Sequence, residues 1–140
     1  MKRTKYVVLA LLIIAGLMIS SCTNNTVQSN LWETATYTED TELGTGDTTI
    51  VVQVVAEDKS VDFTINTDSK ILADALLEHE LIFGEEAQYG LYVKEVNGIV
   101  ADYNINKSYW SLSKNGEYMQ IGVSQAEIAD NDHYELTYTK

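Results

Sequence analysis

The residues best suited to chemistry lie between Tyr109 and Ser124, which read YWSLSKNGEYMQIGVS and place three aromatic rings around an Asn-Gly turn. Tyr and Trp join an apolar ring to one polar group, so they suit a half-wet surface that receives a flat ligand. Tyr109 and Trp110 are adjacent on a predicted strand, so they point to opposite faces and at least one lies off the core. We expect Trp110 on the exposed, ligand-facing side. The alternative is that these rings fill the core from its rim.

Catalytic groups are sparse in the sequence. The two histidines, His79 and His133, have no neighbouring Cys and no HExxH-type partner, and no GxSxG motif or glycine-rich phosphate loop occurs. We therefore expect no enzyme activity and no required cofactor, with scattered Asp and Glu pairs brought together in space as the alternative. We expect His79 to be partly buried and hydrogen-bonded and His133 to lie on the surface. A zinc or cobalt ligand is the alternative for either.

The N-terminus has the features of a bacterial lipoprotein leader. Three basic residues precede the apolar run Val7–Ile19, which is followed by Ser20, Ser21 and the only cysteine, Cys22. This run is long enough for a signal peptide and short for a membrane span. We predict that residues 1–21 are removed, that Cys22 is lipidated, and that the protein is exported and anchored to the outer face of the cell membrane. An uncleaved anchor is the alternative.

The charge of the chain excludes several partners. It carries 21 acidic and nine basic residues, a net charge of −12, and removal of the leader leaves about −15. Such a surface repels phosphate, so we expect no nucleic acid partner and no electrostatic binding to anionic lipid. With Cys22 lipidated, no thiol remains for a disulfide or a metal site. Calcium binding is a weak alternative, because the acids are scattered and form no DxDxDG-type loop.

The exported chain divides into a tether and a domain. Residues 22–47 are mostly polar, with isolated apolar side chains such as Trp32, and we predict a flexible tether. The alternative is that Trp32 docks back on the domain. The domain is predicted to occupy residues 48–140. One helix over residues 71–79 is predicted, capped by Asp68 or Ser69 and ended by Gly84. The predicted strands cover residues 48–56, 60–67, 89–96, 99–104, 109–113, 118–121 and 133–139, with a short helical turn at 124–128.

These elements predict an α+β fold, a β-grasp-like roll in which one helix packs on a mixed β-sheet and the last strand returns to the centre. Two Asn-Gly pairs, at Asn97 and Asn115, predict tight hairpin turns. The Asp-Asn-Asp sequence around Asn131 predicts another turn, since Asn tolerates a left-handed backbone.

The pattern resembles the transcobalamin-like C-terminal domain, a β-grasp-like module of bacterial surface lipoproteins and of transcobalamin and intrinsic factor. The resemblance covers residues 48–140. It rests on the order of Tyr89-Gly90-Leu91-Tyr92-Val93, Tyr109-Trp110, Asn115-Gly116, Gly122-Val123-Ser124 and Asp130-Asn131-Asp132. The usual Asp-Gly-Asp turn is Asp-Asn-Asp here. The helical barrel that encloses the ligand in the animal carriers is absent.

The resemblance implies a cobalamin or another corrinoid as the ligand. Carried over by position, the residues near it are Tyr109, Trp110, Leu112, Gly122, Val123 and Ser124. A single open face would leave much of the ligand in water unless a second protein closes the site. We therefore expect a lipid-anchored cell-surface binding protein. The alternative is a protein-interaction or structural surface module with no small-molecule ligand.

Overall fold

The computed structural model describes residues 30–140. The predicted signal peptide and the lipidated Cys22 lie outside the described residues. Among residues 30–140, no helix is long and apolar enough to cross a membrane.

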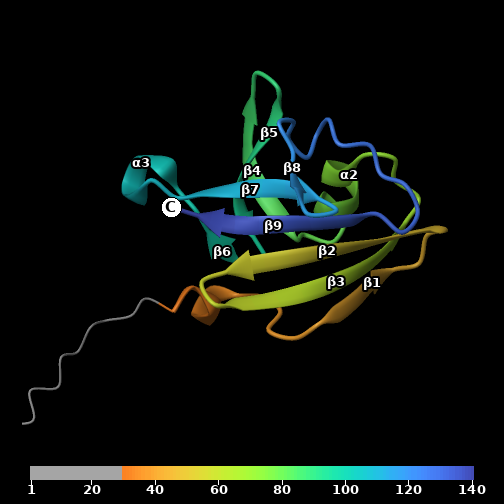
Figure 1. Ribbon diagram of the computed structural model, residues 1–140, viewed down its shortest axis with the longest axis horizontal. Coiled ribbons are helices and arrows are strands. Elements are labelled where there is room, and N and C mark those ends of the chain that lie inside the picture. Colours follow the sequence, from red (N-terminus) through yellow and green to blue (C-terminus); the bar gives the residue numbers. More distant parts are fainter. Residues whose placement is uncertain (1–29) are drawn as a thin grey trace, which may run out of the picture.

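A six-stranded mixed sheet forms one layer of the domain, with the order β1-β3-β2-β9-β7-β8 (Figure 1). Its strands are β1 (Thr41–Gly44), β2 (Thr48–Ala56), β3 (Lys59–Thr67), β7 (Tyr109–Lys114), β8 (Glu117–Tyr118) and β9 (His133–Thr139). The last strand lies in the middle of the sheet, as predicted. It runs parallel to β2 and antiparallel to β7. In β2 every second residue from Ile50 to Ala56 is buried, the period expected of a sheet that covers a core on one face.

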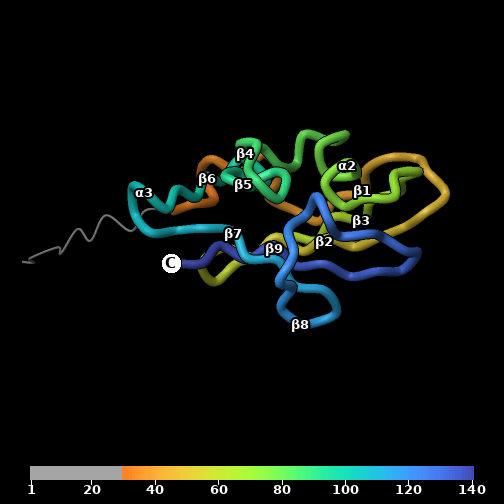
Figure 2. Tube along the Cα trace, turned by 90° about the horizontal axis from the view of Figure 1, so that it is seen from above, coloured from red at the N-terminus to blue at the C-terminus, as the bar shows by residue number. Residues whose placement is uncertain are grey.

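The second layer covers one face of that sheet (Figure 2). It contains a three-stranded sheet of β4 (Ile82–Ala87), β5 (Gly90–Val96) and β6 (Ile99–Val100). It also contains the helix α2 (Leu72–Leu77), the 3-10 helix η1 (Leu31–Thr34) and the one-turn helix α3 (Tyr103–Asn106). The strand-rich α+β class is therefore as predicted, but the prediction of one sheet was incomplete. It missed β4, and the strand at 89–96 belongs to the smaller sheet.

Residues 30–47 are part of the folded domain, so the predicted tether over 22–47 is wrong for this range. The Trp32 side chain is buried, and its Nε1–H donates to the carbonyl of Ala56 at 2.9 Å. Tyr37 meets Phe63 edge to face at 5.5 Å, and β1 pairs with β3 in parallel. The isolated apolar side chains of this polar segment are thus its anchors on the sheet, and the domain begins before Thr48.

The helix α2 is shorter than predicted. It starts after Ile71, which makes no side-chain cap, and it ends at Leu77. Glu80 then takes a positive φ of 54° and reverses the chain. Gly84 lies in β4 instead of capping the helix, beside an irregularity in the pairing with β5, where a Cβ would clash with the Tyr92 carbonyl oxygen.

The tight turns are where the sequence predicts them. Asn97 and Gly98 both have positive φ, as do Asn115 and Gly116, which matches the two-residue hairpin turn that Asn-Gly favours. Asn131 has a φ of 66°. The predicted helical turn at 124–128 does not form. Instead, Glu127 bridges to Ile71, and the Ala126 carbonyl accepts from Leu72 N–H at 2.9 Å.

Candidate functional site

A groove of about 230 Å³ opens between the two layers. One wall is β5, the floor is β7 with Leu136 of β9, and the other wall is β8 with the segment that follows it. The lining residues are Leu91, Tyr92, Val93, Tyr109, Trp110, Ser111, Leu112, Tyr118, Met119, Gln120, Ile121, Gly122, Val123 and Leu136.

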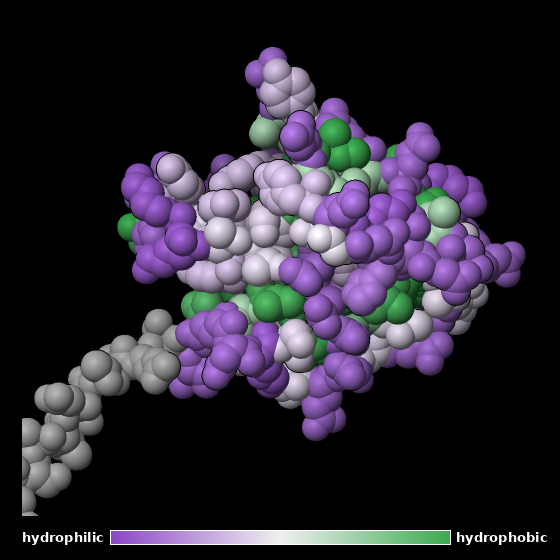
Figure 3. Space-filling model, viewed as in Figure 1, coloured by the Kyte–Doolittle hydropathy of each residue, from purple (hydrophilic) through white to green (hydrophobic). Residues whose placement is uncertain are grey.

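The groove has a buried floor and an exposed aromatic rim. Trp110, Leu112 and Leu136 are buried, because they lie on the side of β7 and β9 that faces the second layer. Val123, in the segment that follows β8, is buried as well. Tyr92, Tyr118 and Ile121 are exposed. Figure 3 shows the outward face of the large sheet, where the surface over β7 is pale and weakly hydrophilic and strongly hydrophilic residues border it.

The lining has no Asp, Glu, Lys, Arg or His, although the chain has a net charge of −12. Its polar groups are phenols, one indole, a serine, a glutamine and the backbone. Pockets of this composition bind mostly apolar ligands and orient them with a few hydrogen bonds.

Comparison with known proteins identifies the family. Residues 69–140 match the family described as a domain of unknown function, DUF4430, and this range contains the whole groove. The chain belongs to the DUF4430 family. A search of curated proteins finds no match.

Two solved structures share the fold of this DUF4430 protein. One is a candidate metal-binding protein from Ruminococcus gnavus ATCC 29149, with 30% sequence identity, a TM-score of 0.64, and 67% of this chain and 98% of that chain covered. The other is haptocorrin in complex with Cbi, with 20% identity, a TM-score of 0.50, and 70% of this chain covered. The chain matches 27% of the haptocorrin chain, and at this identity the likeness shows the fold alone.

The DUF4430 groove brings together five of the six residues predicted for the ligand face. Tyr109, Trp110, Leu112, Gly122 and Val123 all line it, although Gly122 and Val123 are separated from β7 by a hairpin. The sixth, Ser124, does not line the groove. Its Oγ accepts a hydrogen bond from the backbone N–H of Leu91 at 2.9 Å, so it joins the two walls.

The predicted exposure of Trp110 is wrong. Trp110 is only 9% exposed, while Tyr109 is the exposed member of the pair. Trp110 pairs with Tyr138 across the sheet, and their rings meet edge to face at 5.7 Å on the side covered by the second layer. The two residues thus point to opposite faces, as predicted, but the buried one is Trp110 and the exposed one is Tyr109.

The indole of Trp110 carries an unusual polar atom. Its Nε1 is buried and has no hydrogen-bond partner among the described residues. A buried donor left without a partner costs about 1–3 kcal/mol, so such groups concentrate at functional sites. Trp110 is itself one of the residues that line the groove.

The β5 wall and the segment Met119–Ile121 were not among the site residues predicted from the sequence. Leu91, Tyr92 and Val93 form that wall, and they were noted only as part of a family pattern. Their role depends on how the small sheet packs over the large one. No local pattern in the sequence encodes that packing.

The histidines lie elsewhere. His133 is exposed, as predicted. His79 is partly buried as predicted, but its Nε2 has no hydrogen-bond partner among residues 30–140. In the same range, no three His, Cys, Asp or Glu side chains are grouped to hold a metal ion.

Lys114, the last residue of β7, forms an ion pair with Asp132. Lys114 Nζ lies 2.6 Å from Asp132 Oδ2, which also accepts from Tyr134 Oη at 3.0 Å and Ala129 N–H at 2.9 Å. Burial alone would raise the pKa of Asp132, but the hydrogen bonds from Lys114, Ala129 and Tyr134 outweigh it and lower that pKa below its usual value. The hydrogen bond to Asp132 raises the pKa of Lys114. Both groups are therefore held in their charged forms.

Proposed function

We propose that this protein is a non-catalytic, lipid-anchored binding protein of the cell surface whose groove receives one edge or face of a flat, mostly apolar ligand. The observation that carries the proposal is the uncharged, aromatic lining of the groove in a strongly acidic chain. A charged ligand would have no partner inside it. A ligand with an apolar body can pack on Leu112 and Trp110 and meet the phenols of the rim.

A corrinoid is the ligand we propose first. A corrin ring is a broad, mostly apolar disc with amide arms, so its disc suits the apolar floor. Its amides suit the hydroxyl of Tyr118 and the backbone around Gly122. The fold shared with haptocorrin, which was crystallised with Cbi (cobinamide), supports this choice of ligand. No cofactor is needed for such a role.

The size of the groove predicts modest affinity. Pockets that bury most of a drug-sized ligand enclose about 300–1,000 Å³, and this groove has about 230 Å³. A corrinoid would keep much of its surface in water. A second protein seated over the rim would close the site and raise the affinity.

Cys22 supplies the proposed anchor. The basic start, the apolar run and the Ile19-Ser20-Ser21-Cys22 sequence support cleavage before Cys22 and attachment of lipid to its thiol. The proposed location is the outer face of the bacterial cell membrane.

The second candidate function is protein recognition through exposed aromatic side chains in and beside the groove. It is favoured by Tyr89, which is 74% exposed at the tip of the β4–β5 hairpin and does not line the groove. Exposed aromatic side chains of this kind often anchor protein partners.

The test is calorimetric titration of the soluble chain from Thr23 onward with cyanocobalamin and with cobinamide. Saturable binding of both would support recognition of the corrin ring. No heat from either at about 1 mM ligand, where even −4 kcal/mol of binding free energy registers, would remove the corrinoid proposal and favour protein recognition.

A further inference from the structure

The end of the domain from which the chain leads back to Cys22 carries a mostly polar segment, residues 102–108, with two exposed apolar side chains. The orange segment at the start of the described chain, α3 and the C-terminus lie at this same end in both views (Figures 1 and 2). The pairings agree, because Trp32 bonds to Ala56 at the end of β2, and Tyr109, just after α3, pairs with Thr139 at the end of β9. In this segment the side chain of Ile105 is 82% exposed and that of Tyr103 is 52% exposed.

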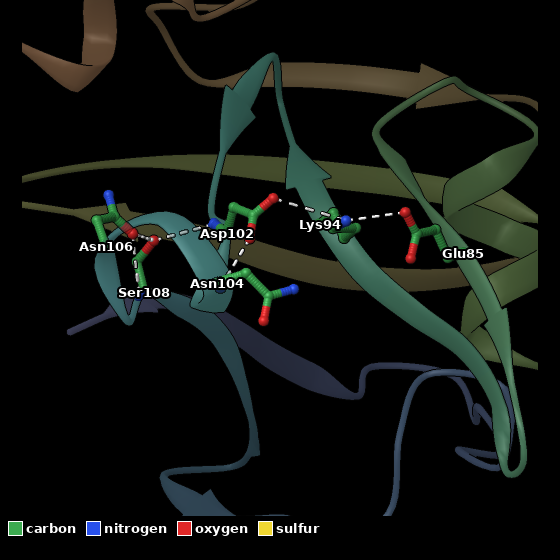
Figure 4. Close-up of polar contacts among 6 residues, drawn as sticks. All are labelled: Glu85, Lys94, Asp102, Asn104, Asn106 and Ser108. Atoms are coloured by element: carbon green, nitrogen blue, oxygen red, sulfur yellow. Dashed lines mark hydrogen bonds and ion pairs between the residues drawn. The ribbon is translucent and has the colours of Figure 1, made fainter.

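Hydrogen bonds within residues 102–108 hold the shape of this segment (Figure 4). Asp102 Oδ1 accepts from Asn104 N–H at 2.8 Å, and Asp102 N–H donates to Ser108 Oγ at 3.1 Å. Ser108 N–H and Oγ–H both donate to Asn106 Oδ1. On the other side, Lys94 Nζ lies 3.7 Å from Asp102 and 2.8 Å from Glu85. None of these bonds uses the side chain of Ile105 or Tyr103, so both are free to contact a partner.

The anchor brings this end close to the membrane. Only eight peptide units separate Cys22 from Asn30, and a fully extended chain of that length spans at most about 29 Å. The domain itself is about 30 Å long along the nine residues of β2, at roughly 3.3 Å per residue. The far end, where Thr45 follows β1, therefore cannot turn toward the membrane without drawing the connection to its full length. The packing of residues 30–47 on the sheet makes the connection this short.

We propose that, in the lipidated protein, α3 seats Tyr103 and Ile105 in the headgroup boundary of the membrane and so fixes the orientation of the domain. This rests on the proposed lipid anchor at Cys22. Phenol and aliphatic side chains suit that boundary. Lys107, whose Nζ lies 4.8 Å from the Tyr103 ring, can extend to the phosphates. The same end also exposes the carboxylates of Glu33, on η1, and of Glu57 and Asp58, in the β2–β3 turn. Because these negative charges do not attract anionic lipid, the apolar side chains must drive the contact.

The experiment uses the full chain, expressed in a bacterium that processes lipoproteins and reconstituted in vesicles of phosphatidylethanolamine and phosphatidylglycerol. Lipid on Cys22 is first verified by mass spectrometry. Because Cys22 is the only cysteine and its thiol is then blocked, Ile105→Cys offers one site for an environment-sensitive fluorophore. Thr45→Cys, at an exposed position of the opposite end, is the matched control. Quenching is measured with lipids that carry a nitroxide near the headgroup.

We expect the label at position 105 to be quenched at least about twofold more strongly than the label at position 45, as for a side chain within the interface. Equal quenching at the two positions would overturn the proposal while leaving the anchor intact. A label at 105 that is shielded from water but not quenched by the nitroxide lipids would also overturn it, in favour of contact with a second protein copy. Absence of lipid on Cys22 would overturn both the anchor and the proposal.

Discussion

Ser124 Oγ accepts the backbone N–H of Leu91 at 2.9 Å, and this bond joins the β5 wall of the groove to the loop of the opposite wall. Ser124→Ala leaves that partly buried N–H without its partner, so we expect the free energy of unfolding to fall by about 1–2 kcal/mol. Urea denaturation measures the loss. Ser60→Ala is the control, because Ser60 is exposed and its side chain makes no hydrogen bond within residues 30–140. Equal effects of the two substitutions would contradict a joining role for Ser124.

Gly122 has no structural need to be glycine. Its φ is not positive, and a Cβ added to it would meet no atom within 4 Å. Gly122→Ala should therefore change the free energy of unfolding by no more than about 0.5 kcal/mol. If ligand approaches the backbone here, the added methyl group should weaken binding about tenfold or more, since overpacking costs about 1–3 kcal/mol.

Gly116 is the matched control for this substitution. A Cβ there also meets open space, but Gly116 has a φ of 82° in the β7–β8 turn. Gly116→Ala should lower stability by about 1–2 kcal/mol and leave ligand affinity unchanged. Titration and urea denaturation of both variants should show that Gly122→Ala loses affinity but keeps its stability, and that Gly116→Ala does the reverse. Unaltered affinity in Gly122→Ala would show that the ligand does not approach this position.

Replacing Trp32 tests how much residues 30–47 contribute to the stability of the fold. Its ring is buried and its N–H is hydrogen-bonded to Ala56. Trp32→Ala should lower the free energy of unfolding by about 3–5 kcal/mol, as for other buried aromatic side chains. A variant as stable as the natural chain would mean that this segment is a tether after all.

Asp132 makes stability depend on pH in acid. Its pKa is lower in the folded protein than its usual value of 3.8, so its contribution is present above that value and is lost as pH falls through the folded pKa. Asp132→Asn should therefore lower the melting temperature at neutral pH. The difference from the natural chain should shrink as the pH approaches about 2. A difference that stays constant over this range would show that the Lys114 pair is not responsible.

Much of the fold was predictable where the determinants are local. The alternation of Val61, Phe63 and Ile65 specified β3, and the Asn-Gly pairs specified the turns at Asn97 and Asn115 through their positive φ. The helix boundary failed because its end depends on Glu80 adopting a positive φ, which Glu seldom does.

The candidate site was predictable in membership but not in orientation. Adjacent residues on a strand must face opposite sides, which the sequence showed for Tyr109 and Trp110. Which side is covered depends on a second layer built from distant residues, including Leu91. The anchoring role of Trp32 was missed for the same reason. Its partner, Ala56, lies 24 residues away.

Two tyrosines test most directly whether the groove binds a small molecule. Tyr118 is 69% exposed and lines the groove, whereas Tyr89 is 74% exposed and does not. Neither supports the core, so Tyr118→Ala and Tyr89→Ala should both fold normally. Titration of both variants with cyanocobalamin and cobinamide should show affinity reduced about tenfold for Tyr118→Ala, since a well-packed aromatic contact contributes more than 1 kcal/mol, and unchanged for Tyr89→Ala. Equal affinities in the two variants would contradict binding in the groove.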